Sequence, residues 1–191
     1  FELDKGEEEK RATEALLDDL FLEGALVTAD ANAATPTIAE KIVAGGGDYL
    51  IGLKGNQKTL RRYAGLAFER LGDSLETFTV EAKAHGRVER RSYRQVALED
   101  VDWGPSLEAG WKKIAAKWEK AKLSSVLEIR STRAVGDKKS EEIRYAFSST
   151  QNNLEELAYA SRAHWGIENG LHWILDVSFG EDLARMRADH A

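Results

Sequence analysis

Four polar side chains near the C-terminus follow one another at steps of four residues: His164, Glu168, His172 and Asp176. An α-helix turns once per about 3.6 residues, so this spacing places them along one helical face. An apolar stripe on another face consists of Ile167, Leu171 and Ile174. The pattern predicts a helix that packs on a core and presents imidazole and carboxylate groups.

A further carboxylate with chemical potential is Asp30, which directly follows the short apolar run Ala25–Ala29. Such a run predicts a buried strand, and the loops after parallel strands are where open α/β sheets usually bind ligands. Taken singly, Asp30 is equally typical of a helix cap, and Glu168 of a solvated surface carboxylate. Taken together, they suggest a metal site, because Mg²⁺ prefers oxygen ligands. Two such ions about 4 Å apart can activate the attacking oxygen and stabilise the leaving oxygen in phosphodiester cleavage.

The two histidines leave a second kind of metal site open. Glu168 and His172 could share one ion, as ligands four residues apart do in zinc helices. His164 and His172 are about 12 Å apart along the helix axis, so all three cannot share one ion. We therefore interpret the histidines as groups that orient Glu168 or contact phosphate, with a helix-borne metal hydrolase as an alternative.

Alternating helices and strands precede this final helix. Residues 7–20 predict an amphipathic helix with Leu16, Leu17 and Leu20 facing inward. Pro36 begins and Gly45 ends a helix over 36–44. A second buried strand covers 49–53, and another helix covers 57–71. This order predicts a parallel α/β core.

The middle of the chain has a different pattern. Alternating or β-branched runs predict strands over 77–81, 88–96, 125–129 and 143–147. A helix-like stretch over 109–122 interrupts these strands, which indicates an antiparallel β insertion. Asn153 is a candidate N-cap for the last helix, with Glu156 at the capping-box position. The expected division is 1–76 for the first part of the core, 77–150 for the insertion and 151–191 for the C-terminal helix region.

Composition bounds the class of protein. The 191 residues are 42% hydrophobic, which is enough for a core. There is no cysteine, which excludes disulfides and thiolate metal sites and fits a reducing cytoplasm. No apolar run is long enough to predict a membrane span, and no leader pattern is visible.

The net charge of −6 is unevenly distributed. Residues 1–23 carry nine acidic and three basic side chains, so the rest of the chain sums to zero. Basic residues gather in Lys83–Arg94 and in Lys54–Arg62. Because phosphate binding depends on local positive patches, the acidic total does not exclude a nucleic-acid partner. For each patch, a solvated hairpin or a simple turn is the alternative.

Several motifs in fixed order resemble one family. They are Val27–Ala31, Ile38–Ile42, Gly47–Leu50, Leu53–Gln57, His85–Glu89 and Arg162–Asp176. In this order the chain resembles the bacterial insertion-sequence DDE transposases of the H-repeat-associated type. The most specific segment of the resemblance is HWGIENGLHW followed by LDVSF.

The resemblance implies a ribonuclease-H-like fold in which two aspartates and a glutamate hold divalent metal. By that resemblance, Asp30 matches the second aspartate and Glu168 matches the glutamate. No residue of this chain matches the first aspartate, and residues 1–20 and 104–122 fit the pattern poorly. We therefore expect an incomplete ribonuclease-H-like core, the C-terminal part of a catalytic domain that is inactive by itself. A non-catalytic DNA-binding or assembly remnant of a transposase is the alternative.

The resemblance also implies ligands and partners. Two Mg²⁺ ions are expected in the intact site, with Mn²⁺ as a substitute and without a small-molecule cofactor. The partner implied is double-stranded DNA, as transposon ends and target, in a bacterial cytoplasm and without a membrane; a homodimer is compatible. The expected DNA contacts are Lys54, Asn56, Gln57, Arg87, Arg90, Arg162, His164 and Trp165, although Trp165 is also typical of a core or interface. The expected supporting residues are Asn169, His172 and Asp176.

Overall fold

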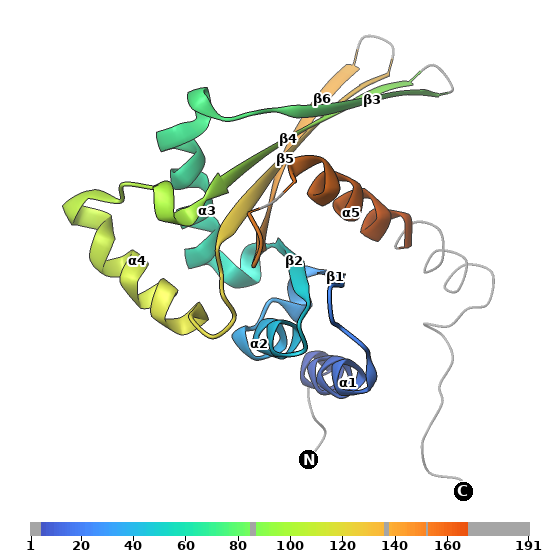
Figure 1. The fold of residues 1–191 in the computed structure, drawn as a ribbon. Helices are drawn as coiled ribbons and strands as arrows, with labels where there is room; N and C mark the ends of the chain where they lie inside the picture. The colour runs from blue at the N-terminus through green and yellow to red at the C-terminus, as the bar shows by residue number, and fades with distance from the viewer. Residues whose placement is uncertain (1–4, 85–86, 136–137, 152, 168–191) are drawn as a thin grey trace, which may run out of the picture.

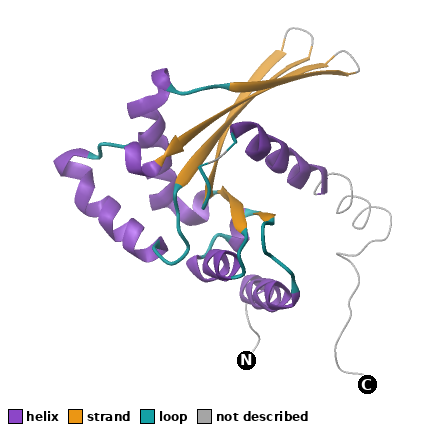
Figure 2. Cartoon of the chain, viewed as in Figure 1, coloured by secondary structure: helices purple, strands orange, loops and turns teal. Residues whose placement is uncertain are grey.

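The computed structural model describes residues 5–84, 87–135, 138–151 and 153–167. Six strands in these ranges form one curled sheet, with helices on both sides (Figures 1 and 2). The chain order begins α1 (Lys5–Asp19), β1 (Leu26–Ala29), α2 (Pro36–Ala44), β2 (Asp48–Leu53) and α3 (Lys58–Leu71). It continues with β3 (Phe78–Ala84), β4 (Arg87–Ala97), α4 (Gly104–Trp118), β5 (Ser125–Val135), β6 (Lys138–Ser148) and α5 (Leu154–Ile167).

The sheet joins a parallel pair to an antiparallel set, in the order β1-β2-β6-β5-β4-β3. β1 pairs in parallel with β2, with Leu26 opposite Asp48. β2 pairs antiparallel with β6, from Leu50 opposite Ser148 to Leu53 opposite Tyr145. β6, β5, β4 and β3 then follow in antiparallel register. The predicted parallel core and antiparallel insertion are both confirmed, and the fold is compatible with a partial ribonuclease-H-like core. The division at residues 76 and 150 stays a prediction.

The two faces of the sheet bury separate cores. Successive side chains of a strand point to opposite faces, so each strand contributes to both. One core lies under α2, α3 and α4 and includes Tyr49, Ile51, Val96, Val126 and Phe147. The other lies under α5 and includes Leu50, Tyr93, Leu127, Ala146 and Leu157. We call this second surface the α5 face, and Figure 1 shows α5 on the side of the sheet opposite α3 and α4.

Local sequence signals explain where the helices begin and end. Thr35 caps α2 by accepting a hydrogen bond from the Ile38 amide at 3.2 Å, and Pro36 opens the helix. Gly46 adopts a left-handed φ of 83° in the turn after α2. Asn153 Oδ1 accepts a hydrogen bond from the Glu156 amide at 3.2 Å, so the predicted cap of α5 is confirmed.

The prediction for the first helix is wrong in one respect. Leu17 is buried, but Leu16 and Leu20 are 58% and 50% exposed. The helix contacts α2, where Lys41 Nζ lies 2.6 Å from an Asp18 carboxylate oxygen and 3.1 Å from the Glu14 carbonyl. Of the three leucines, Leu17 alone belongs to the core cluster that contains Ile38 and Ile42 of α2.

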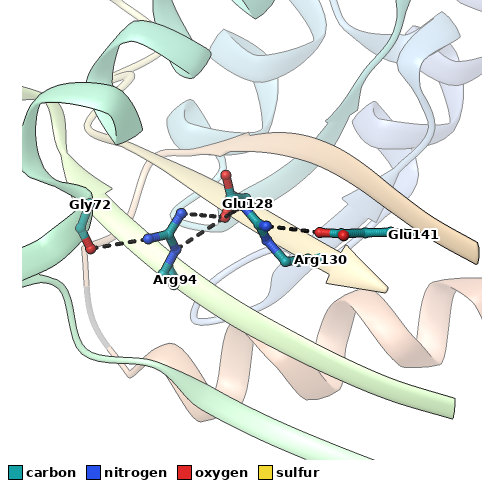
Figure 3. A network of polar contacts seen from close by, with 5 residues as sticks. All are labelled: Gly72, Arg94, Glu128, Arg130 and Glu141. Carbon is teal, nitrogen blue, oxygen red and sulfur yellow. Dashed lines mark hydrogen bonds and ion pairs between the residues drawn. The ribbon is translucent and has the colours of Figure 1, made fainter. Parts of the chain in front are cut away.

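A partly buried charge network ties α3 to the antiparallel strands (Figure 3). The Arg94 guanidinium donates to Glu128 Oε1 at 2.6 Å and to the Gly72 carbonyl at 3.0 Å. Arg130 Nη2 lies 3.8 Å from the same glutamate oxygen, and Arg130 also donates to Glu141 at 2.8 Å. The Glu128 side chain is only 4% exposed, so Arg94 supplies the compensating charge inside the core.

In the part of the chain that the structure describes, no helix has both the length and the apolar character needed to cross a membrane.

Candidate active site

Asp30 directly follows β1 and caps the short helix η1 (Ala31–Ala33). Its Oδ1 accepts a hydrogen bond from the Asn32 amide at 2.6 Å. The backbone at Asp30 is still extended, with φ −77° and ψ 176°, so the alternation of the strand continues through it. Leu26 packs against the core under α5. Asp30 is four residues further along the same extended segment, so its side chain points to the same face as that of Leu26. Asp30 therefore belongs to the α5 face, at the carboxyl end of a parallel strand.

Lys54 lies beside Asp30 at the carboxyl end of β2. Its Nζ is 3.5 Å from Asp30 Oδ2, and the two side chains are 69% and 32% exposed. The Lys54 backbone is extended, and Lys54 is four residues after Leu50, so both side chains point to the α5 face. The loops after the two strands are also joined by Gln57, which donates to the Ala34 carbonyl at 2.6 Å. The sequence-predicted residues Asp30, Lys54 and Gln57 thus meet at one edge of the sheet.

The end of α5 approaches this edge over the same face. The first turns of α5 pack through Leu157 and Ala158 on the core that contains Leu50. Further along the helix, the Trp165 ring lies over Arg144 of β6, with the guanidinium carbon 4.7 Å from the ring centroid. The pairing of β2 with β6 ends with Leu53 opposite Tyr145. If the same register is continued by one residue, Lys54 comes opposite Arg144. The helix therefore runs toward the carboxyl edge that carries Asp30.

Trp165 is held from two strands. The guanidinium carbon of Arg91 on β4 lies 5.5 Å from the same ring centroid. Each arginine also pairs with a glutamate two residues along its own strand, Arg91 with Glu89 and Arg144 with Glu142. The carboxylate of Glu142 consequently has a pKa below its usual value, mainly through its hydrogen bond to Arg144. The Arg91–Trp165–Arg144 cluster fixes the last described turn of α5 to the sheet.

The remaining sequence-predicted residues have different outcomes. Arg162 is exposed and His164 is half-buried, both on α5. Arg90 is exposed on β4, opposite Glu81 and Thr132. The side chains of Asn56 and Arg87 lie outside the described parts of the structure. Glu168, Asn169, His172 and Asp176 also lie outside the described residues.

Asp30 has the chemistry of a single metal ligand. Its Oδ1 accepts from the Asn32 amide, and its Oδ2 lies 3.5 Å from the Lys54 ammonium, which a bound metal ion would have to displace or share the carboxylate with. Carboxylate oxygen is the donor that hard divalent ions prefer. Within residues 5–84, 87–135, 138–151 and 153–167, no group of three or more His, Asp or Glu side chains is arranged to hold a metal ion.

Comparison with known proteins assigns the sequence to a family. Residues 3–191 match the family described as Transposase DDE domain. The chain belongs to the DDE transposase family. Domains of this family generally use divalent metal ions and act as transposases, which agrees with a carboxylate at the end of a parallel strand.

The relatives of this DDE domain are bacterial proteins. It is 35% identical to YbfL of Escherichia coli K12 over 98% of this chain and 49% of YbfL. It is 34% identical over the same shares to YhhI of the same strain, which is named as a candidate transposase of the H repeat-associated group. It is 36% identical to YncI of Escherichia coli O157:H7 over 92% of this chain and 44% of YncI. The chain thus spans about half the length of these relatives, and no solved structure matches it.

Sequence reasoning missed the partners of Trp165 in this DDE domain. Arg91 was expected only as a member of the basic patch Lys83–Arg94, and Arg144 was not expected to have a role, although each stands two residues from a glutamate on a strand. Residues two apart on a strand share a face, so the pairs Glu89–Arg91 and Glu142–Arg144 were a readable signal. The sequence does not contain the register of β4, β5 and β6, and it is this register that brings Arg91 and Arg144 close to each other across β5.

Proposed function

We propose that this chain is the C-terminal part of a DDE transposase catalytic domain that cleaves and joins DNA strands with divalent metal. One observation carries the proposal: Asp30 and the end of α5 lie on the same face of the sheet and near the same edge, where β1 and β2 end. Glu168 follows Trp165 by three residues in the sequence, and Trp165 lies over Arg144, next to the position of Lys54. In this proposal Asp30 and Glu168 are two carboxylates of one metal site.

The chain's own residues would have distinct roles in the reaction. Asp30 would hold metal through Oδ2, while its Oδ1 stays bonded to the Asn32 amide and fixes the carboxylate plane. Lys54 would neutralise a phosphate oxygen brought to the same position, because its ammonium is exposed and adjacent. Bound Mg²⁺ would supply activation of water and stabilisation of the leaving oxygen.

Further roles belong to the same proposal. Asn56, Gln57, Arg87, Arg90, Arg162, His164 and Trp165 would contact DNA, and Asn169, His172 and Asp176 would support Glu168. The substrate would be double-stranded DNA, the transposon ends and the target, at the bacterial nucleoid. Because no residue of the chain matches the family's first aspartate, we propose that the 191 residues by themselves do not cleave DNA.

Metal binding tests the two-carboxylate site without relying on catalysis. Titration with Mn²⁺ should broaden the Asn32 amide resonance selectively in nuclear magnetic resonance spectra, because this amide donates to Asp30. We expect Asp30→Asn to abolish the broadening and Glu168→Gln to weaken Mn²⁺ binding at least tenfold. Broadening that is unchanged in Glu168→Gln would show that the two carboxylates do not share a site.

The alternative function has its own outcome. A non-catalytic DNA-binding remnant would bind duplex DNA with a steep salt dependence and without any response to Mn²⁺. A helix-borne zinc hydrolase would retain stoichiometric zinc that is lost in His172→Ala. Robust Mg²⁺-dependent nicking by the 191-residue chain, abolished in Asp30→Asn, would overturn the proposed inactivity.

A further inference from the structure

Of the nine cations whose side chains the structure describes on β3 to β6, five pair with a neighbouring carboxylate and four do not. The ion pairs join Lys83 to Glu81, Arg91 to Glu89, Arg94 to Glu128, Arg130 to Glu141 and Arg144 to Glu142. The exceptions among the described side chains are Arg90, Arg133, Lys138 and Lys139, toward the hairpin ends. The strand patch that looks most basic in the sequence is therefore mostly balanced in the fold.

A different surface carries positive charge without such partners. Lys58, Arg61 and Arg62 on α3 and Lys117 on α4 are exposed and form no ion pair with a residue that the structure describes. The three α3 residues are spaced at i, i+3 and i+4, so they project from one side of the helix. Lys117 belongs to the helix that packs beside α3.

These side chains line two grooves that meet at the start of α3. The first groove, of about 280 Å³, lies between α3 and α4 and is lined by Gly55, Lys58, Thr59 and Lys117. The second, of about 410 Å³, lies on the other side of α3 and is lined by Gly55, Lys58, Arg61, Arg62 and Tyr145. Gly55 and Lys58 line both grooves, so the two form one continuous basic surface around the beginning of α3.

This surface begins beside the candidate active site. Gly55 directly follows Lys54, whose ammonium lies 3.5 Å from Asp30. The grooves lie on the α3 and α4 side of the sheet, so a polyanion held at Asp30 and Lys54 on the α5 face would reach them by passing around the carboxyl edge at Gly55. The exposed large hydrophobic side chains of the described chain lie elsewhere, for example Leu16, Leu20 and Phe21 around the end of α1. Leu60, Ile114 and Trp118 also line the first groove but are buried, and Leu66 and Glu69 also line the second.

We infer that the grooves beside α3, lined by Lys58, Arg61, Arg62 and Lys117, bind the phosphate backbone of the DNA duplex that leaves the Asp30 edge. The inference rests on the proposed function and adds a second DNA surface, separate from the strand hairpins. Contacts to phosphate by lysine and arginine fix position and affinity and carry no base sequence. Binding of DNA to this surface should therefore not depend on the base sequence of the duplex.

Salt-dependent binding of a fluorescent duplex tests this assignment. The groove variant is Arg61→Gln with Lys117→Gln, one change in each groove. The control is Lys112→Gln with Lys120→Gln, which removes the same charge from two exposed lysines, one on α4 and one just after it, that already pair with Glu108 and Glu40. Each lost phosphate contact lowers the slope of log K against log salt by about 0.9. We expect the slope to fall by roughly 2 and the affinity at least tenfold in the groove variant, with the control close to wild type.

A chemical cross-link gives an independent measurement. The chain has no cysteine, so Thr59→Cys places one thiol in the first groove. A duplex carrying a disulfide tether on its backbone should cross-link to this thiol at least ten times faster than to Lys112→Cys on α4. Equal slopes in both double variants, or equal cross-linking rates, would overturn the inference. If Mn²⁺ fails to bind at Asp30 while the groove variant loses DNA binding, the proposed metal site fails and the DNA surface stands.

Discussion

The guanidinium carbon of Arg144 lies 4.7 Å from the centroid of the Trp165 ring, and Arg91 approaches the same ring from another strand. Each cation–π contact contributes about 0.5–1 kcal/mol at a partly exposed site. We therefore expect Trp165→Leu to accelerate hydrogen exchange of the last turn of α5 about tenfold. The first turn, which is held by Leu157, should keep its exchange rate.

The control for this prediction is Trp165→Phe, which keeps an aromatic face over both arginines. It should restore at least half of the lost protection. If Leu and Phe give the same exchange rates, Trp165 acts through its volume and the arginines do not hold it. If exchange accelerates throughout the helix, the substitution destabilises the whole fold.

Asp30 has a structural role that can be separated from chemistry. Its Oδ1 caps η1 through the Asn32 amide. Loss of such a cap costs about 1 kcal/mol, whereas Asn retains it. We expect urea denaturation to give a free energy of unfolding about 1 kcal/mol lower in Asp30→Ala and close to wild type in Asp30→Asn. An equal loss in both variants would show that the Lys54 ion pair, rather than the cap, stabilises this loop.

The network around Glu128 should be the most sensitive to a single charge deletion. Arg94→Met leaves a carboxylate that is 4% exposed with only Arg130, at 3.8 Å, as a charged neighbour. Breaking a buried pair in this way costs about 3–5 kcal/mol, so we expect a loss of about 3 kcal/mol in urea denaturation. Lys112→Met removes an exposed pair and should cost less than about 1 kcal/mol. A similar small loss for Arg94→Met would mean that Glu128 is compensated by Arg130 alone.

Alkaline pH should weaken the fold through buried tyrosines. Burial, followed by the nearby Glu89 charge, raises the pKa of Tyr93 to about 12, against about 10 in an unfolded chain. The folded state therefore keeps a proton that the unfolded state loses, so this contribution is full below pH 10 and falls away as pH rises to 12. Tyr49, whose pKa is also raised mainly by burial, adds to the same trend.

Urea midpoints at pH 9, 10 and 11 measure this effect. The midpoint should fall from pH 10 to pH 11 in the wild type, and fall less in Tyr93→Phe. Tyr159→Phe, on an exposed tyrosine, is the matched control and should behave as wild type. Identical pH dependence in Tyr93→Phe and wild type would contradict the prediction.

Residues that begin and end helices, together with short apolar runs, made the parallel half of the fold predictable. Pro36 and Gly45 predicted a helix over 36–44, and α2 covers Pro36–Ala44. The apolar run 49–53 corresponds to β2, Asp48–Leu53. Here each residue type has a local reason for its conformation, so a pattern within the chain is sufficient. The strand-end position of Asp30 followed from the same reasoning.

The ends of the antiparallel strands were harder to predict, because they depend on pairing with neighbouring strands. The run 125–129 was predicted as a strand, but β5 extends to Val135. Its second half is polar and is stabilised across the sheet, as in the pair of Arg130 with Glu141. The helix predicted over 109–122 begins earlier, at Gly104, whose φ of 63° turns the chain into Pro105. Register and cross-strand charge are non-local, so no window of sequence contains them.

The junction between β2 and β6 makes the sheet a mechanical element as well as a scaffold. Four residue pairs, from Leu50–Ser148 to Leu53–Tyr145, join the parallel strands to the long hairpins. A load applied to the long strands would reach Asp30 and Lys54 through this seam and, in parallel, through the Arg94 contact with Gly72 after α3 and the Trp165 contacts of α5. We therefore expect strain in the long strands to be shared among three attachments and not concentrated at the seam.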